Sequence, residues 1–225
     1  MDTVITTANT TSSMQPGDSI PVTGQQGQVD LVKIARQAGV GRFVLVSIPL
    51  NMEDCPFTTA QRTVEEAVMK SGMDYTILCP TIFMEDWLSP AMGFDYANAR
   101  ATIYGGGHAG NQYISMGDVA QYVVECLDNS AARNQVIEVG QPQATSMLEA
   151  VRIFEKSAGK SFELEFIPEA TLVAQREAST DPMQVSFATF MLNMAHGIRV
   201  DNALAERLFS FPLASVEDYA RRMLG

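Results

Sequence analysis

Short apolar segments alternate with amphipathic helical segments along most of this chain, and this alternation constrains the fold more than any other feature of the sequence. The β-branched segment Met1–Ala8 predicts a first strand, and Phe43–Ile48 and Tyr75–Cys79 predict two strands that are buried on both faces. Apolar residues spaced three and four apart predict helices over Val29–Ala38 and Thr58–Ser71. Strands that alternate with helices in this way predict an α/β fold with a doubly wound parallel sheet and right-handed crossovers.

The remaining segments add loops, caps and further helices. Asn9–Gln28 is rich in Thr, Ser, Gly, Pro and Gln and predicts a long polar loop. Ser115–Asp118 and Ser146–Glu149 have the spacing of capping boxes, and each predicts the start of a helix. Phe162–Ile167 alternates apolar with polar residues and predicts a half-exposed strand, whereas everything from Glu169 onward has a helical pattern.

No glycine-rich phosphate-binding turn precedes the first predicted strand. In a doubly wound dinucleotide-binding fold, such a turn and the helix after it hold the pyrophosphate. Gly105, Gly107 and Gly110 satisfy the string G-x-G-x-x-G, but a predicted strand, Asn111–Met116, follows them in place of a helix. These glycines therefore indicate a turn between strands, and the predicted fold is N-terminally incomplete.

Composition and charge exclude several classes of function. The net charge is −11, from 15 Lys and Arg against 26 Asp and Glu, so we expect no nucleic-acid partner. No apolar segment approaches the roughly 20 residues that span a bilayer, so we expect no membrane partner. The two histidines, His108 and His196, lie far apart without spaced acidic residues, which predicts no metal site.

The three cysteines point to a reducing compartment. Cys55, Cys79 and Cys126 are odd in number and have no C-x-x-C spacing. We expect two of them to be buried and one to be a loop thiol, in a cytoplasmic protein.

Four segments, taken in this order, resemble the NmrA-like family of atypical short-chain dehydrogenases/reductases. They are DTVITTAN, VDLVKIARQAGVGRFVLVS, AQRTVEEAVMKSGMDYTILCPTIFMEDWL, and ISMGDVAQYVVECL followed by VIEVGQP. The resemblance implies a Rossmann-like NAD(P)-binding domain over residues 1–140. Residues 141–225 would form a small, mostly helical substrate-cleft subdomain of the same fold.

The resemblance also implies that the N-terminal part of the family's fold is missing. Family members begin with a strand, a G-x-x-G-x-x-G turn and two further βα units, and nothing here corresponds to these. The chain is either a fragment whose Met1 is an internal start or a natural protein without the phosphate site, and the exposed edge strand favours the fragment. We expect Val4–Thr7 at one sheet edge, followed by Phe43–Ser47, Tyr75–Cys79 and Gln135–Val139.

The acid–base pair of the related reductases is absent at the matching positions. The family's Tyr-x-x-x-Lys falls on Phe57 and Gln61, and phenylalanine cannot donate a proton. Catalytic residues are therefore unknown, with Ser47 as a weak candidate. The residues expected by resemblance to contact the cofactor are Thr7, Ala8, Asn9, Ser47, Gln61, Pro80, Thr81, Ile82 and Phe83.

The function expected from the resemblance is that of an NAD(P)-linked reductase acting on a small conjugated carbonyl or quinone-type substrate. We expect this chain to bind NAD(P) weakly or not at all, because the phosphate turn is missing. One alternative is a non-catalytic nucleotide-sensing regulator or assembly protein, and another is a truncated product without function. A homo-oligomer is compatible with the sequence. The Met-rich helix Met183–Met194 is interpreted either as core or as a pliable cover over the substrate cleft.

Overall fold

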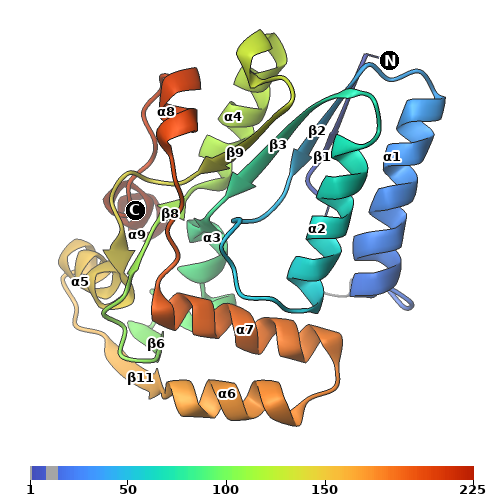
Figure 1. Ribbon diagram of the computed structural model, residues 1–225. Helices are drawn as coiled ribbons and strands as arrows, with labels where there is room; N and C mark the ends of the chain where they lie inside the picture. Colours follow the sequence, from blue (N-terminus) through green and yellow to red (C-terminus); the bar gives the residue numbers. More distant parts are fainter. Residues whose placement is uncertain (1, 9–14) are drawn as a thin grey trace.

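A four-stranded parallel sheet forms the centre of the computed structural model, which describes residues 2–8 and 15–225 (Figure 1). Its strands are β1 (Thr3–Thr6), β2 (Arg42–Val46), β3 (Asp74–Pro80) and β9 (Gln135–Val139), in that spatial order. β1 lies at one edge, so the predicted strand order is confirmed. Because the strands are parallel, their carboxyl ends lie along one edge of the sheet.

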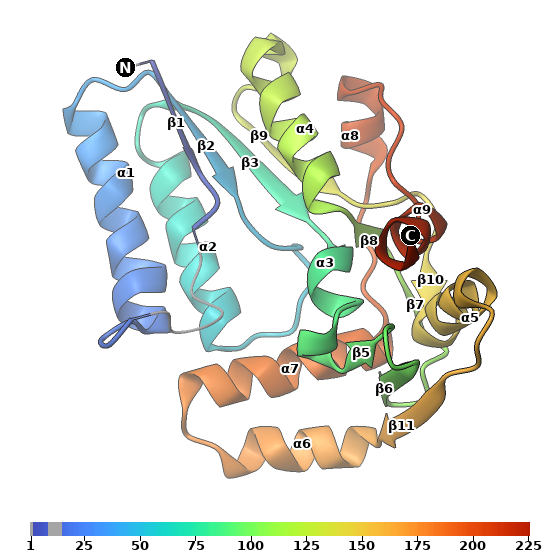
Figure 2. The same ribbon diagram turned by 180° about the vertical axis from the view of Figure 1, so that it is seen from behind.

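Helices cover both faces of this sheet. α1 (Gln28–Gln37) and α2 (Pro56–Met69) lie on one side and α4 (Met116–Asp128) lies on the other (Figures 1 and 2). Neighbouring residues of β2 point to opposite sides, so that Leu45 packs with α1 and α2 while Val44 packs with α4. Burial on both sides explains the continuous apolar sequence of the strand, and it confirms the doubly wound α/β class.

A second, smaller sheet lies beside the first and carries the largest apolar cluster. Its order is β11 (Glu163–Ile167), β6 (Arg100–Tyr104) and β5 (Phe94–Asp95), with β6 parallel to β11 and antiparallel to β5. α5 (Met147–Ala158) and α9 (Val216–Leu224) contribute to the same cluster.

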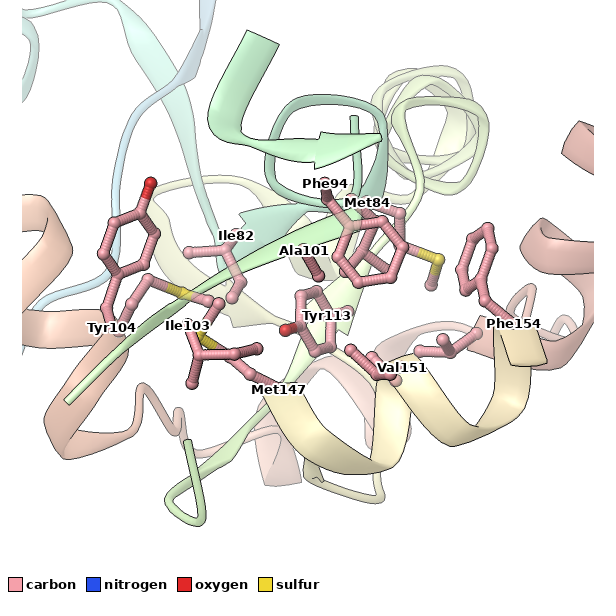
Figure 3. Packing of buried hydrophobic residues seen from close by; sticks show 14 of the residues in the cluster. Ile82, Met84, Phe94, Ala101, Ile103, Tyr104, Tyr113, Met147, Val151 and Phe154 are labelled. Carbon is pink, nitrogen blue, oxygen red and sulfur yellow. The ribbon is translucent and has the colours of Figure 1, made fainter. Parts of the chain in front are cut away.

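Aromatic rings form the centre of that cluster (Figure 3). The rings of Phe94 and Phe154 meet edge to face with centroids 4.9 Å apart. The cluster combines residues from the segments 82–113 and 147–220. The domain division near residue 140 stays a prediction.

Further elements connect these parts. They are α3 (Met84–Trp87), α6 (Glu169–Ala178), α7 (Pro182–His196), α8 (Ala203–Leu208), the pair β4 (Ile82–Phe83) and β8 (Tyr113–Ile114), the pair β7 (Gly110–Asn111) and β10 (Thr145–Ser146), and single 3₁₀ turns at Pro90–Met92 and Ser130–Ala132.

One of the two predicted capping boxes is complete. Ser146 Oγ accepts from Glu149 N at 3.2 Å, and Glu149 Oε2 accepts from Ser146 N at 2.8 Å. Ser115 Oγ likewise accepts from Asp118 N at 3.0 Å, but the Asp118 carboxylate accepts from Ala214 N at 3.1 Å and does not return to Ser115. Asp118 thus joins the start of α4 to the C-terminal segment.

Part of the predicted polar loop Asn9–Gln28 is helical. A π-helical segment spans Ile20–Gly27 and buries Ile20 against α2. The prediction was wrong here because a local cap outweighs the polar composition: Ser19 Oγ accepts from Val22 N at 3.2 Å, and Pro21 occupies the first turn.

Two further predictions need correction. The predicted strand Asn111–Met116 is divided into β7 and β8, because Gln112 between them bonds elsewhere and donates from its backbone N to Ile198 O at 2.8 Å. The region after Glu169 contains four helices, but non-helical segments at residues 197–202 and 209–215 separate the last three of them.

All three cysteines are buried, so the expected loop thiol is absent among them. Cys55 is the N-cap residue of α2, where packing against Phe57 encloses it. Burial raises the pKa of Cys79, and burial raises the pKa of Cys126 to about 11. Within residues 2–8 and 15–225, no helix has both the length and the apolar character needed to cross a membrane.

Truncation of Phe154 should destabilise the protein strongly. Phe154→Ala removes a fully buried ring and leaves a cavity, so we expect the free energy of unfolding to fall by about 3–5 kcal/mol in urea titrations. Phe166→Ala is the matched control, because Phe166 on β11 is 50% exposed and should change the same quantity by less than about 1 kcal/mol. Equal losses in the two variants would contradict the packing described.

Candidate functional site

The carboxyl ends of β2 and β3 bring two hydroxyl residues to one edge of the sheet. Ser47 follows β2, and its backbone N donates to Leu78 O at 2.7 Å. Thr81 follows β3, and its backbone N donates to Val139 O at 2.9 Å. The parallel pairing therefore continues past the strand ends, at the edge where open α/β sheets bind ligands.

A cavity of about 350 Å³ opens at this edge. Its walls come from the loop after β2, the first turn of α2, the segment after β3, α3, and α7, which runs past these strand ends (Figure 1). The lining residues are Ser47, Ile48, Pro49, Met52, Phe57, Pro80, Thr81, Ile82, Phe83, Asp86, Trp87, Ala91, Met92, Phe187 and Phe190. A mostly apolar, aromatic lining with few polar groups is typical of a site for a small flat molecule.

An aromatic contact joins α2 to α7 at the cavity wall. The rings of Phe57 and Phe190 meet edge to face with centroids 5.3 Å apart. Phe57 N also donates to Ser186 Oγ at 3.2 Å. Position 57, where the resemblance places the tyrosine of the related reductases, is thus an apolar wall. The Met-rich helix both contributes to the core and lines the cavity with Phe187 and Phe190.

Gln61 lies one helical turn after Phe57 but does not line the cavity. Its side chain is only 2% exposed, and its Oε1 has no hydrogen-bond partner. A buried carbonyl oxygen without a donor is an unsatisfied acceptor, which is unfavourable.

A partly buried ion pair supports Ser47. Ser47 Oγ donates to Glu65 Oε1 at 2.5 Å, and Arg62 Nη1 donates to the same oxygen at 2.5 Å. Arg62 Nη2 also donates to Pro49 O in the cavity wall. The sequence analysis missed this pair. The sequence feature that could have indicated it is the spacing of Glu65, which lies four residues and thus one helical turn after Gln61, on the same face of α2.

The residues expected to contact a cofactor separate into two groups. Ser47 and the run Pro80–Phe83 line the cavity together. Thr7 and Ala8 are exposed at the carboxyl end of β1 and are not among the lining residues, while Asn9 lies outside the described residues. Thr81 Oγ1 is buried and has no partner.

His196 holds the loop after β2 against the C-terminal helices. Its Nδ1 lies 3.2 Å from Glu53 Oε1 and its Nε2 lies 3.3 Å from Glu169 Oε2. Arg176 Nη1 donates to Glu53 Oε2 at 3.0 Å. These contacts join the loop to both α6 and α7, and His196 is not among the cavity lining.

Asp86 is the titratable side chain in the lining of the cavity. Although it reaches solvent, loss of hydration raises its pKa, and the negative charge of Glu85 raises it further. The carboxylate therefore carries its charge less readily than an isolated aspartate.

The family model described as the NmrA-like family matches residues 1–209. The chain belongs to the NmrA-like family. It is 25% identical over 226 residues to the isoflavone reductase homolog IRL of Zea mays, which covers 92% of this chain and 72% of the maize protein. It is also 25% identical over 175 residues to the isoflavone reductase of Cicer arietinum, which covers 72% of this chain but only 55% of that relative.

Solved structures show the same fold. The Citrobacter sp. triphenylmethane reductase complexed with NADP(H) superposes with a TM-score of 0.75 at 12% identity, covering 99% of this NmrA-like chain and 76% of that enzyme. The likeness at this identity concerns the fold, a Rossmann-like α/β architecture.

Substitution of Asp86 should change how stability depends on pH. Well below pH 4 Asp86 is protonated in both the folded and the unfolded chain, so its raised pKa does not affect stability there. As pH rises past the pKa of the unfolded chain, the unfolded chain releases this proton more readily than the folded one, so wild type loses stability relative to Asp86→Asn, which cannot ionise. In urea unfolding from pH 3 to 7, we expect the stability of Asp86→Asn relative to wild type to increase with pH.

Asp95→Asn is the control of opposite sign. Hydrogen bonds from Asn98 lower the pKa of Asp95, so its contribution is present above about pH 4 and is lost as pH falls through the folded-state pKa. The stability of Asp95→Asn relative to wild type should therefore decrease with pH. The same trend in both variants would contradict the raised pKa of Asp86.

Proposed function

We propose that this chain is an NAD(P)-linked reductase-like protein whose cavity binds a small conjugated carbonyl or quinone-type substrate next to the nicotinamide. The observation that carries the proposal is the aromatic cavity at the carboxyl ends of β2 and β3. Membership of the NmrA-like family supports it, as do the relatives described as isoflavone reductases.

Several residues fit the nicotinamide half of the cofactor. Ser47 and Pro80–Phe83 line the cavity. We assign Gln61 Oε1, a buried acceptor without a donor that lies outside this lining, to a ribose hydroxyl that reaches it when the surrounding side chains rearrange. The cofactor, when bound, supplies the hydride. The chain positions the reactants and excludes water with Phe57, Phe187 and Phe190.

The chain offers no phenol for proton transfer at the family's usual position. Phe57 cannot donate a proton, and Gln61 supplies no cation to lower the pKa of a neighbour. We therefore propose that orientation and water exclusion, rather than a strong general acid, form the protein's contribution.

The absence of a phenol at position 57 also favours the alternative of a nucleotide-sensing regulator or assembly protein. A ring at position 57 that is packed against Phe190 favours binding over proton transfer. The two proposals differ in one measurable property, since a regulator binds ligands in the cavity without turnover of any carbonyl or quinone.

The first prediction concerns cofactor affinity. No Lys or Arg lines the cavity in the part of the chain that the structure describes, so the pyrophosphate gains little there. We expect calorimetric titration to give weak NADPH binding, with an affinity close to that of reduced nicotinamide mononucleotide. Low-micromolar NADPH affinity, far tighter than the mononucleotide, would show a phosphate site elsewhere in the chain.

The second prediction tests the chemistry. Phe57→Tyr combined with Gln61→Lys restores a phenol and the cation that tunes it, and a positioned acid contributes on the order of 10²- to 10⁴-fold. Steady-state kinetics against quinones and aldehydes, at millimolar NADPH, should show a higher kcat in the double variant than in Phe57→Tyr alone.

Gln61→Ala provides the counterpart in the same assay. It should raise the KM for NADPH more than it lowers kcat, because Gln61 is assigned to ribose binding. A large loss of kcat with unchanged KM would contradict that role. Absence of turnover in every variant, with ligand binding retained, would favour the regulator.

A further inference from the structure

The hydrogen-bonding capacity of Ser47 is restricted by what lies behind it. A serine hydroxyl has one proton to donate and two lone pairs to accept with. Ser47 donates that proton to Glu65 Oε1 at 2.5 Å. A glutamate carboxylate at neutral pH accepts only, so the direction of this bond is fixed. Towards the cavity, Ser47 can only accept.

The Glu65 carboxylate is held firmly in place. Glu65 is 5% exposed and shares its Oε1 between Ser47 and Arg62. Arg62 in turn donates to Pro49 O, in the cavity wall. A buried carboxylate paired with a guanidinium is a strong acceptor, so Ser47 does not release its proton to a weaker one.

The other polar side chains of the lining differ in what they offer a ligand. Asp86 accepts when ionised. Thr81 Oγ1 is buried without a partner and lies near Gly140 together with the Thr81 methyl group, which a Cβ added to that glycine would approach to 2.8 Å. Trp87 supplies the only side-chain N–H among the lining residues, and none of those residues is Lys, Arg or His.

We propose that Glu65 and Arg62 are positioning residues that make the cavity prefer the hydroxyl form of a ligand to its carbonyl form. An alcohol can donate a hydrogen bond to Ser47 Oγ. The carbonyl oxygen of a ketone is itself an acceptor, so it forms no hydrogen bond with an oxygen that can only accept. The proposal rests on the proposed function in that both place the ligand in this cavity. If the cavity reduces a carbonyl, it holds the reduced product more tightly than the substrate.

Trp87 makes the preference measurable without turnover. It is the single tryptophan of the chain and lines the cavity, so its fluorescence reports ligand binding there. The probes are 1-tetralol and 1-tetralone, a matched alcohol and ketone, titrated without nucleotide. In wild type we expect 1-tetralol to bind roughly three- to tenfold more tightly, the range that one net hydrogen bond provides.

Glu65→Gln should remove or reverse that preference. The carboxamide keeps the shape of the side chain but loses its charge, and its oxygen must still accept from Arg62. An amide oxygen is a weaker acceptor than a carboxylate, so Ser47 can turn its proton towards a ketone in the cavity. The ratio of the two dissociation constants should fall to about one or below. Glu66→Gln is the matched control: it neutralises an adjacent glutamate that is exposed and paired with Lys70, and it should keep the wild-type ratio.

Ser47→Ala provides a second, independent route to the same result. It removes the acceptor while leaving the Glu65–Arg62 pair intact, so the ratio should also fall to about one. Circular dichroism melts verify that each variant is folded.

Three outcomes would overturn the proposal. Tighter binding of 1-tetralone in wild type contradicts the assigned polarity, and an unchanged ratio in both Ser47→Ala and Glu65→Gln contradicts the role of Ser47. Failure of wild type to bind either probe would overturn the proposed ligand cavity as well, which distinguishes the two failures.

Discussion

The parallel pairing of β2 with β3, under helices on both faces, is the constraint on which the rest of the structure depends. Burial on two sides favours apolar side chains in the carboxyl-terminal halves of these strands, Val44–Val46 and Ile77–Cys79, and polar side chains occur before and after them. Because the strands are parallel, both carboxyl ends reach the same edge, and Ser47 and Thr81 follow there. The cavity is what α2, α3 and α7 enclose at that edge.

The resemblance places the acid–base pair of the related reductases at Phe57 and Gln61. Phe57 is part of an aromatic wall with Phe190, and Gln61 has a buried polar atom without a charge. The charged side chains near the site are Asp86 in the lining and the Glu65–Arg62 pair behind Ser47.

The features that depend on local sequence were predictable. The strands, most helix starts and the sheet order follow from periodicity, caps and the order of the family segments, and the complete cap at Ser146 is an example. The lining by Pro80–Phe83 follows from position after a strand end. The Glu65–Ser47 bond and the Phe57–Phe190 contact join residues distant in sequence, and no single segment encodes them. The helix after Ser19 was missed because a cap overrode a polar composition.

The bond from Phe57 N to Ser186 Oγ joins residues 129 positions apart. Proteins are synthesised from the N-terminus, and the sheet strands β1, β2, β3 and β9 all precede α7 in the chain. The sheet can therefore form on the ribosome before its cavity has a complete wall. A ligand whose binding depends on contacts with Phe187 and Phe190 binds only after α7 has emerged. Its binding energy therefore stabilises the completed protein but not the nascent chain.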